Sequence, residues 1–213
     1  MKKYRWIIPV LLVTAGACTK DNYIDSGLSN GRFAGSLLEY MEAPWHSYDW
    51  DSTALMVHHA GADVVRLFEG KDPAHPKITF FGPTNHSIRR YMFQRGIERV
   101  SDMDPAWCKR VLLSHVVDGK IFKEDIPEGI AGTSGAVKGE GGKTYKTLAD
   151  THFWAYTYVE AYNGVAGLGR TRLYLVAEEA LRTIDIASAN IEPDNCVVHS
   201  LQYAYTLGDN LNF

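Results

Sequence analysis

The chain has 213 residues, of which 46% are hydrophobic and 22% are charged, the composition of an ordinary globular protein. Its 22 basic and 25 acidic residues give a formal net charge of −3, and no cluster of Lys or Arg marks a phosphate-binding face. These values argue against nucleic acid as a partner, and the lack of internal repeats favours one folded domain.

The first 18 residues have the pattern of a bacterial lipoprotein signal. Three basic residues begin it: Lys2, Lys3 and Arg5. The apolar stretch that follows, residues 6–17, has 12 residues, whereas a membrane-spanning helix needs roughly 20. Small residues then precede Cys18. We expect residues 1–17 to be removed and Cys18 to carry a lipid, with an ordinary cleaved signal peptide as the alternative. Removal leaves a net charge of 19 − 25 = −6.

The polar residues 18–32 are predicted to form a flexible tether, followed by a folded domain over residues 33–213. A short helical pattern covers residues 37–41. A longer helix is predicted to begin at an N-cap at Asp51–Ser52 and to break or bend near Gly61.

A short apolar run at residues 78–81 is typical of a buried strand. Thr84 or Asn85 is positioned to cap the helix that follows it. A further helix is predicted to begin at Asp104–Pro105 and to lead into a strand near His115.

Six of the fourteen residues from 129 to 142 are glycine, which predicts a mobile loop or a wide hairpin turn. Strand patterns dominate the rest of the chain, at residues 153–162, 172–176, 180–186 and 197–207. Helices in the first half and strands in the second predict an α+β domain instead of a doubly wound sheet.

Three short segments carry a family resemblance. Phe80–Asn85 is similar to a strand-end motif Phe-Ala-Pro-Thr-Asn, and Leu112–Lys120 is similar to a Tyr-His segment in which Ser114 replaces the Tyr. Asn195–Leu201 is similar to a closing Asn-Gly-Val-Ile-His segment, with Cys196 in the Gly position. Together, in this order and spacing, they resemble a fasciclin (FAS1) domain over nearly all of the predicted domain.

The resemblance implies a wedge-shaped β-sandwich flanked by several short helices. It also implies a secreted or anchored protein that mediates adhesion, with neither a cofactor nor catalytic residues. Because Ser114 stands in the Tyr position, an adhesive role of that Tyr in relatives is not carried over.

Four residues of these motifs are interpreted as structural. Thr84 or Asn85 can accept hydrogen bonds from the free N–H groups of a helix start, a contribution of about 1 kcal/mol. His115 and His199 lie in apolar strand sequence, where a buried imidazole needs partners for its ring nitrogens. A ligand-binding or catalytic role is the less favoured alternative for both histidines.

The residues offer little for catalysis or metal binding. Adjacent helical residues such as His58 and His59 point about 100° apart, so they do not share a metal ion as residues four apart do. The segment Gly139–Thr144 lacks a required position of the phosphate-binding loop. The segment Gly132–Ala136 lacks a required position of the Gly-x-Ser-x-Gly elbow. We expect no enzyme, metal site or cofactor. Two cysteines besides Cys18 are either separate buried thiols or a disulfide: Cys108 and Cys196.

The strongest pattern for a binding surface is the predicted strand 153–162. Alternation places its aromatic residues about 6 to 7 Å apart on one face, a spacing suited to sugar rings or to a partner protein. The candidate ligand-binding residues are Trp154, Tyr156, Tyr158 and Tyr162. The favoured alternative is that helices or a second sheet cover this face. Other aromatic residues that can extend the surface are Trp45, Tyr48, Trp50, Tyr203 and Tyr205.

The sequence therefore predicts a non-catalytic adhesion or protein-interaction module of the cell envelope, anchored by a lipid on Cys18, at the outer membrane. The membrane is the expected partner of the lipid, and the domain's own partner is a protein or a glycan. The alternative function is a glycan-binding accessory protein of a surface polysaccharide-uptake system. An exported hydrolase is a third and weaker interpretation.

Overall fold

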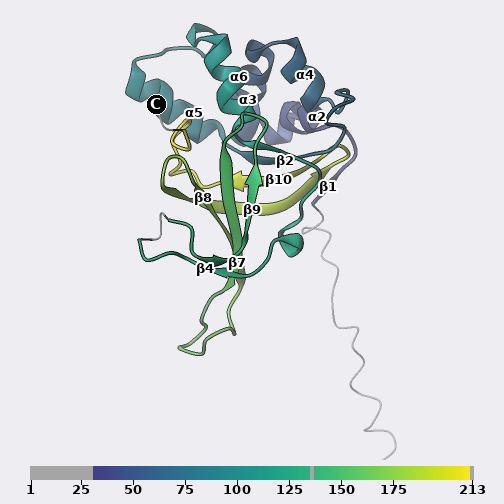
Figure 1. The fold of residues 1–213 in the computed structure, drawn as a ribbon. Coiled ribbons are helices and arrows are strands. Elements are labelled where there is room, and N and C mark those ends of the chain that lie inside the picture. The colour runs from purple at the N-terminus through teal and green to yellow at the C-terminus, as the bar shows by residue number, and fades with distance from the viewer. Residues whose placement is uncertain (1–30, 135–136, 212–213) are drawn as a thin grey trace, which may run out of the picture. The chain divides into compact units, whose positions relative to one another are not determined.

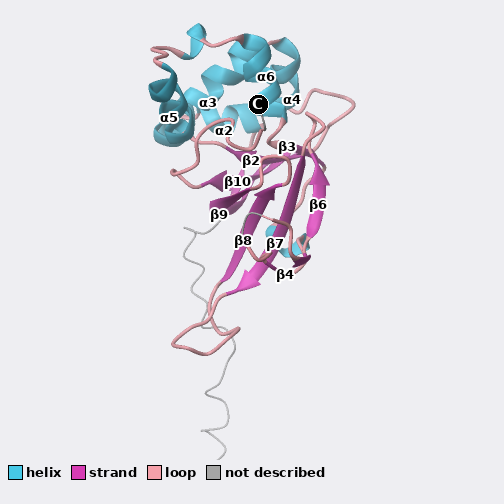
Figure 2. Ribbon diagram, turned by 60° about the vertical axis from the view of Figure 1, so that its left-hand side comes forward, coloured by secondary structure: helices cyan, strands magenta, loops and turns pink. Residues whose placement is uncertain are grey.

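The computed structural model describes residues 31–134 and 137–211. The predicted signal peptide, Cys18 and most of the predicted tether lie outside the described residues. In the described unit, the helices gather at one end of a curved sheet, and a long hairpin of two strands extends away from them (Figure 1, Figure 2).

Five α-helices are present in the described ranges: α2 (Leu37–Glu42), α3 (Ser47–Ala60), α4 (Ala62–Phe68), α5 (Asn85–Arg95) and α6 (Pro105–Leu113). Short 3-10 turns occupy Pro44–His46, Val100–Asp102 and Lys123–Asp125. Local sequence explains several helix ends. The Asp104 side chain caps α6 by accepting from two backbone N–H groups, with Pro105 at the first helical position, as predicted. Gly61, at φ 121°, separates α3 from α4, which confirms the predicted break.

Helix α3 begins at least five residues earlier than the sequence predicts. Asp51 and Ser52 lie inside the helix, whose N-cap residue is His46. The predicted cap is therefore wrong. The 3-10 turn at Pro44–His46 leads directly into α3, so the chain is already helical before it reaches the capping residues.

The sheet order is β3-β2-β10-β9-β8-β7-β6, with β1 on the outer side of β9 and a separate pair β4-β5. Strands β2 and β10 are parallel, as are β1 and β9, and the other neighbours are antiparallel. The strands are β1 (Arg32–Phe33), β2 (Ile78–Gly82), β3 (Val116–Asp118), β4 (Gly129–Ile130), β5 (Glu140–Gly141), β6 (Lys143–Lys146), β7 (His152–Val159), β8 (Thr171–Ala177), β9 (Arg182–Pro193) and β10 (Cys196–Leu201).

Strand β9 joins the two halves of the sheet. Its first part pairs with β8, and its later part pairs with β10 and β1. It therefore extends to Pro193, beyond the predicted end at Ile186. Strand β10 ends at Leu201 instead of Leu207, because the chain then turns and the N–H of Tyr205 donates to the carbonyl oxygen of Gln202 at 2.9 Å.

Three buried clusters hold the described unit together, and side-chain alternation divides the residues of β2 between the first two. Ile78 and Phe80 pack toward the helices, whereas Phe81 packs between the two halves of the sheet. There its ring meets the ring of Phe153 from β7, with centroids 5.6 Å apart. The second cluster is thus the core of a β-sandwich, and the α+β class predicted from the sequence is confirmed.

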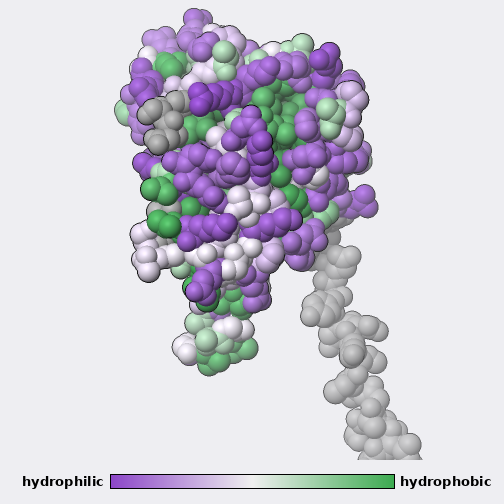
Figure 3. All heavy atoms as spheres, viewed as in Figure 1, coloured by the Kyte–Doolittle hydropathy of each residue, from purple (hydrophilic) through white to green (hydrophobic). Residues whose placement is uncertain are grey.

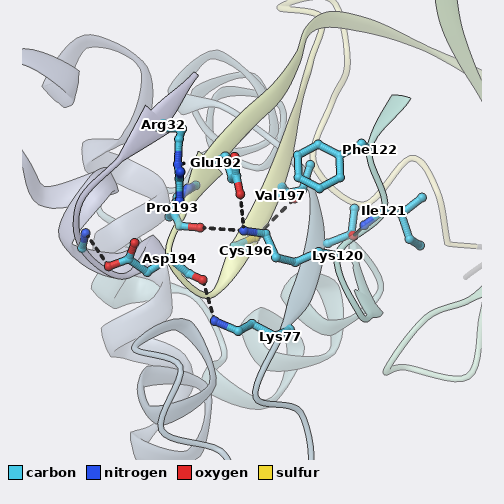
Figure 4. Close-up of polar contacts among 12 residues, drawn as sticks. Arg32, Lys77, Lys120, Ile121, Phe122, Glu192, Pro193, Asp194, Cys196 and Val197 are labelled. Atoms are coloured by element: carbon cyan, nitrogen blue, oxygen red, sulfur yellow. Dashed lines mark hydrogen bonds and ion pairs between the residues drawn. The ribbon is translucent and has the colours of Figure 1, made fainter. Parts of the chain in front are cut away.

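A polar clasp lies at the end of β9 that pairs with β1, and it consists of Lys77, Lys120, Glu192, Pro193 and Asp194 (Figure 4). Lys120 donates to Glu192 at 2.8 Å and to the carbonyl oxygen of Pro193 at 3.4 Å, and both charged side chains are largely buried. The hydrogen bond from Lys120 lowers the pKa of Glu192. Lys77 donates to the carbonyl oxygen of Asp194 at 2.7 Å. The clasp therefore joins the end of β9 to the segments that flank β2 and β3.

Candidate interaction site

The part of the β7 aromatic row formed by Trp154 and Tyr156 does not form a surface. Trp154 is 0% exposed and Tyr156 is 4% exposed. Their rings stack at 4.5 Å, and Tyr174 of β8 stacks on Tyr156 at 5.3 Å. The predicted binding row is therefore wrong for these two residues, because no ligand can reach them. Of the four candidates, only Tyr158 and Tyr162 are exposed.

The glycine-rich segment covers this row. Its β4-β5 pair lies on the aromatic face, and the indole N–H of Trp154 donates to the carbonyl oxygen of Gly141 at 3.0 Å. A Cβ atom on Gly142 would lie 2.6 Å from the Trp154 ring nitrogen, and one on Gly129 would lie 2.8 Å from the Tyr156 Cβ. Glycine is needed here for close approach. Of the two predicted alternatives, a mobile loop or a wide hairpin turn, the antiparallel β4-β5 pair is the hairpin, and it packs on the row as a ribbon.

The connection between β7 and β8, residues 160–170, is the hairpin tip. Three of its apolar side chains are each more than half exposed: Tyr162, Val165 and Leu168. Figure 1 shows the tip at the end farthest from the helices, and Figure 3 shows hydrophobic residues gathered there. Tyr162 and Val165 exchange backbone hydrogen bonds of 2.9 and 3.0 Å. The tip is therefore an ordered apolar projection.

Charged residues stabilise the base of the hairpin tip. Glu160 pairs with Arg170 at 3.0 Å and with Arg172 at 3.1 Å, and these bonds lower the pKa of the Glu160 carboxyl. The guanidinium of Arg172 also lies 5.0 Å from the centre of the Tyr174 ring. Glu160 thus links the two strands below the apolar tip.

A groove of about 680 Å³ opens beside the hairpin tip. Strand β6 pairs with β7 only as far as Ala155, and Pro127 accepts a hydrogen bond from the N–H of Thr157 on the same edge. Beyond that point the β4 ribbon and β7 separate. Side chains that line the groove include Glu128, Ile130, Glu140, Tyr158, Val159 and Ala166. The tip and the groove together form the candidate interaction site, which is apolar with acidic residues at its margin.

Of the two residues predicted to cap α5, Thr84 lies at the cap position and Asn85 lies inside the helix. Thr84 is the N-cap residue of α5, but its side chain makes no capping hydrogen bond and its hydroxyl has no partner among the described residues. Asn85 bonds to the start of α3 instead. It accepts from the N–H of Ser52 at 2.6 Å and donates to the carbonyl oxygens of Ser47 and Tyr48. The motif therefore joins two helices.

The two motif histidines are buried in the core. For His115, Nδ1 lies 2.8 Å from the carbonyl oxygen of Val111 and Nε2 lies 2.9 Å from the hydroxyl of Tyr205. His199 donates from Nε2 to the carbonyl oxygen of Ile121 at 2.9 Å, and its Nδ1 has no partner in the described ranges. Burial lowers the pKa of each to about 4. Neither ring is placed to contact a ligand.

Two neighbouring histidines and two cysteines remain from the sequence analysis. His58 pairs with Glu42, and His59 with the carbonyl oxygen of Met103. In the part of the chain that the structure describes, no group of three His, Cys, Asp or Glu residues could hold a metal ion. Cys108 and Cys196 are free and buried; burial raises the pKa of Cys108 to about 11 and that of Cys196 further. Such thiols are poor nucleophiles.

The apolar residues of the hairpin tip and the contacts of Tyr203 could not be predicted from the sequence. Val165 and Leu168 follow no strand or helix period, so only their position between two paired strands indicates a projecting tip. Tyr203, by contrast, is 43% exposed and lies against His86 and Asp49, which are far from it in sequence. Tyr205, two residues later, is buried.

Comparison with solved structures gives a similarity to a FAS1 domain pair from the insect cell adhesion molecule Fasciclin I. The TM-score is 0.47 at 11% sequence identity, and the alignment covers 72% of this chain and 43% of that protein's length. No curated protein matches the sequence. Among the described residues, no helix is long and apolar enough to span a bilayer.

The model of the fasciclin domain family matches residues 53–204, well over half of the chain, and includes all three motif segments. Fasciclin domains are generally non-enzymatic and are linked to cell adhesion. This chain belongs to the fasciclin domain family.

Proposed function

We propose that this protein is a lipid-anchored adhesion or interaction module of the cell envelope, without catalytic activity, that contacts its partner through the hairpin tip and the adjoining groove. Membership of the fasciclin domain family supports the adhesive role. The signal-like pattern that ends at Cys18 supports the lipid anchor and an outer-membrane location.

The observation that carries the proposal is the exposed apolar surface of the hairpin tip. Tyr162, Val165 and Leu168 are displayed on a hairpin whose base is held by the Glu160 ion pairs. Burying one large apolar side chain in a partner contributes about 1.5–3 kcal/mol. A folded protein that keeps three such residues in water on a projection presents a contact surface.

The polar clasp supports a tethered function. A domain held by a lipid on Cys18 would be pulled through its N-terminal segment, which enters the described unit beside β1. The Lys120–Glu192 bond and the pairing of β1 with β9 resist displacement at that point. Largely buried ion pairs are screened less by salt than exposed pairs, so this contact should persist in a saline environment.

The anchor is tested first. In the native host, cells grown with labelled palmitate should incorporate the label into the full chain and retain it in the membrane fraction. The Cys18→Ala chain should do neither, because the predicted lipid attachment atom is gone. Equal labelling of both chains would contradict lipid anchoring.

The contact surface is tested by attachment. A host strain that lacks the protein is complemented with the full chain, with a variant that carries Tyr162→Ser, Val165→Ser and Leu168→Ser, or with Phe93→Ser as the matched control. Phe93 is 89% exposed on α5, at the helical end of the unit. The tip variant should lose attachment at equal surface amount, and the control should keep it. Full attachment by the tip variant would contradict the proposal.

A further inference from the structure

A second exposed cluster of aromatic rings lies at the helical end of the unit, formed by three separate parts of the chain. Tyr48 comes from the start of α3, His86 from the start of α5, and Tyr203 from the turn after β10. The rings of Tyr48 and His86 meet edge to face at 5.4 Å, and those of His86 and Tyr203 stack at 4.2 Å. We call these three residues with Asp49 the open cluster.

Tyr203 is held in place although it is exposed. Its hydroxyl donates to Asp49 Oδ1 at 3.0 Å, and its carbonyl oxygen accepts from Arg90 at 3.1 Å. His86 covers one face of the ring, so the exposed 43% belongs to the opposite face and the edge. A ring fixed by three contacts loses little conformational entropy when a ligand stacks on it.

Polar groups surround the open ring. The Tyr203 hydroxyl donates to Oδ1 of Asp49, and Oδ2 of the same carboxylate can accept a hydrogen bond from a ligand. The guanidinium of Arg90 keeps other N–H donors beyond the one that it directs at Tyr203. The Nε2 atom of His86 is buried within the cluster without a partner in the described ranges.

We propose that the open cluster binds a neutral carbohydrate, with the exposed face of Tyr203 as the stacking platform. A pyranose ring presents an apolar C–H face, which suits an aromatic ring, and hydroxyl groups at its edge, which suit a carboxylate and a guanidinium. Asp49 and Arg90 place one charge of each sign beside the ring, so the site has no net charge that favours an ionised sugar. Tyr48, which is 66% exposed, extends the platform to a second sugar unit.

The open cluster differs in chemistry from the candidate interaction site. The hairpin tip offers Val165 and Leu168, aliphatic side chains that fit a protein pocket. The open cluster instead combines aromatic faces with a fixed carboxylate. The hairpin tip lies at the end farthest from the helices, whereas the open cluster includes the starts of α3 and α5 (Figure 1). Sugar binding therefore goes beyond the proposed function, and each can fail without the other.

The test uses the full chain in detergent on an array of neutral gluco-, xylo-, manno- and galacto-oligosaccharides, followed by calorimetry with the strongest soluble ligand. The chain should bind at least one of these classes. Tyr203→Ala should weaken binding at least tenfold, and Asp49→Asn several-fold. Tyr162→Ala, in the hairpin tip, is the matched control and should bind as the unchanged chain does.

A second variant guards against a folding defect. Tyr48→Ala removes only an exposed ring at the start of α3, and it should weaken binding several-fold with unchanged unfolding by urea. Lack of binding to every oligosaccharide on the array would overturn the proposal. So would binding that survives both Tyr203→Ala and Tyr48→Ala. Loss of attachment in the tip variant with intact sugar binding would leave both accounts standing as separate functions.

Discussion

The row on β7 and the open cluster contain the same kinds of side chain in opposite situations. Trp154 and Tyr156 stack on each other and are buried, whereas Tyr203 stacks on His86 and keeps one face in water. A regular strand pattern marks the first, and no local pattern marks the second. Alternation identifies which side chains share a face of a strand, but the packing of a distant segment decides whether that face is exposed to solvent.

Glycine decides the outcome on β7. The ribbon can approach the aromatic row only because Gly129 and Gly142 lack side chains, and Gly141 lets β4 and β5 lie close to each other. The donated hydrogen bond from Trp154 to Gly141 satisfies the only polar atom of the indole. At the open cluster, Asp49 accepts a hydrogen bond at the edge of the Tyr203 ring and His86 stacks on one face of it. The other face of the ring is left uncovered.

The largest effect should come from truncating the buried row. Trp154→Ala should lower the free energy of unfolding by about 3–5 kcal/mol, because it leaves a cavity under the ribbon. Tyr203→Ala should lower it by less than about 1 kcal/mol, since its ring is already partly in water. Urea unfolding of both variants measures the difference. Equal losses would mean that the two rings are equally buried, against the comparison.

The fit of the ribbon is tested by adding one methyl group. Gly142→Ala forces a left-handed residue, which costs about 1–2 kcal/mol, and presses a Cβ atom against Trp154, which adds about 1–3 kcal/mol of overpacking. Gly164→Ala is the matched control, because Gly164 has φ 80° but nothing within 4 Å of its Cβ position. Thermal or urea unfolding should show a larger loss for Gly142→Ala. A loss no larger than the control's would indicate that the ribbon does not pack on the row.

The buried interior predicts a loss of stability in mild acid. His115 and His199 have a pKa of about 4 in the folded state, below the value near 6.5 of an unfolded chain. The unfolded state therefore binds more protons between these values, and stability falls as pH decreases. Each histidine contributes a slope of up to about 1.4 kcal/mol per pH unit.

Urea unfolding between pH 6.5 and 5 measures this slope before most carboxylates titrate. His115→Gln should reduce the slope of unfolding free energy against pH by the amount that one of the two histidines contributes. A free energy of unfolding that does not change over this range would show that the two imidazoles are accessible to water, which contradicts the described burial.

Tyr203 and Tyr205 are two residues apart and also differ in burial, so their hydroxyl groups should differ in their contribution to stability. Tyr205→Phe should cost about 1–3 kcal/mol, because the buried Nε2 of His115 and the side chain of Asn210 each lose the hydroxyl as a partner. Tyr203→Phe removes an exposed hydrogen bond to Asp49 and should cost less than about 0.5 kcal/mol. Paired urea unfolding curves give both values. Equal losses of unfolding free energy in the two variants would contradict the difference in burial between the two hydroxyls.

Much of the fold follows from local sequence. The break at Gly61, the cap at Asp104 and the apolar strand near Phe80 depend on neighbours along the chain, and the structure has them where the sequence predicts them. The α+β class follows from the same local patterns. The family could be predicted because its motif segments keep their order and spacing.

The rest depends on contacts between distant residues. Asn85 has the residue type of a helix cap, yet it bonds to α3 because that helix lies beside it. Strand β9 extends because β10 and β1 offer partners. For the candidate sites, alternation predicts which β7 side chains share a face, but neither the ribbon over them nor the meeting of Tyr48, His86 and Tyr203 has a local signal.

Trp154 and Tyr156 of β7 are inaccessible to solvent, whereas the hairpin tip and the open cluster face water. Hydroxyl-radical footprinting of the full chain, read by mass spectrometry at each aromatic residue, measures this directly. Tyr162 and Tyr203 should be oxidised rapidly, and Trp154 and Tyr156 should be protected until the chain unfolds. Oxidation of Trp154 in the folded protein as fast as Tyr162 would contradict the account.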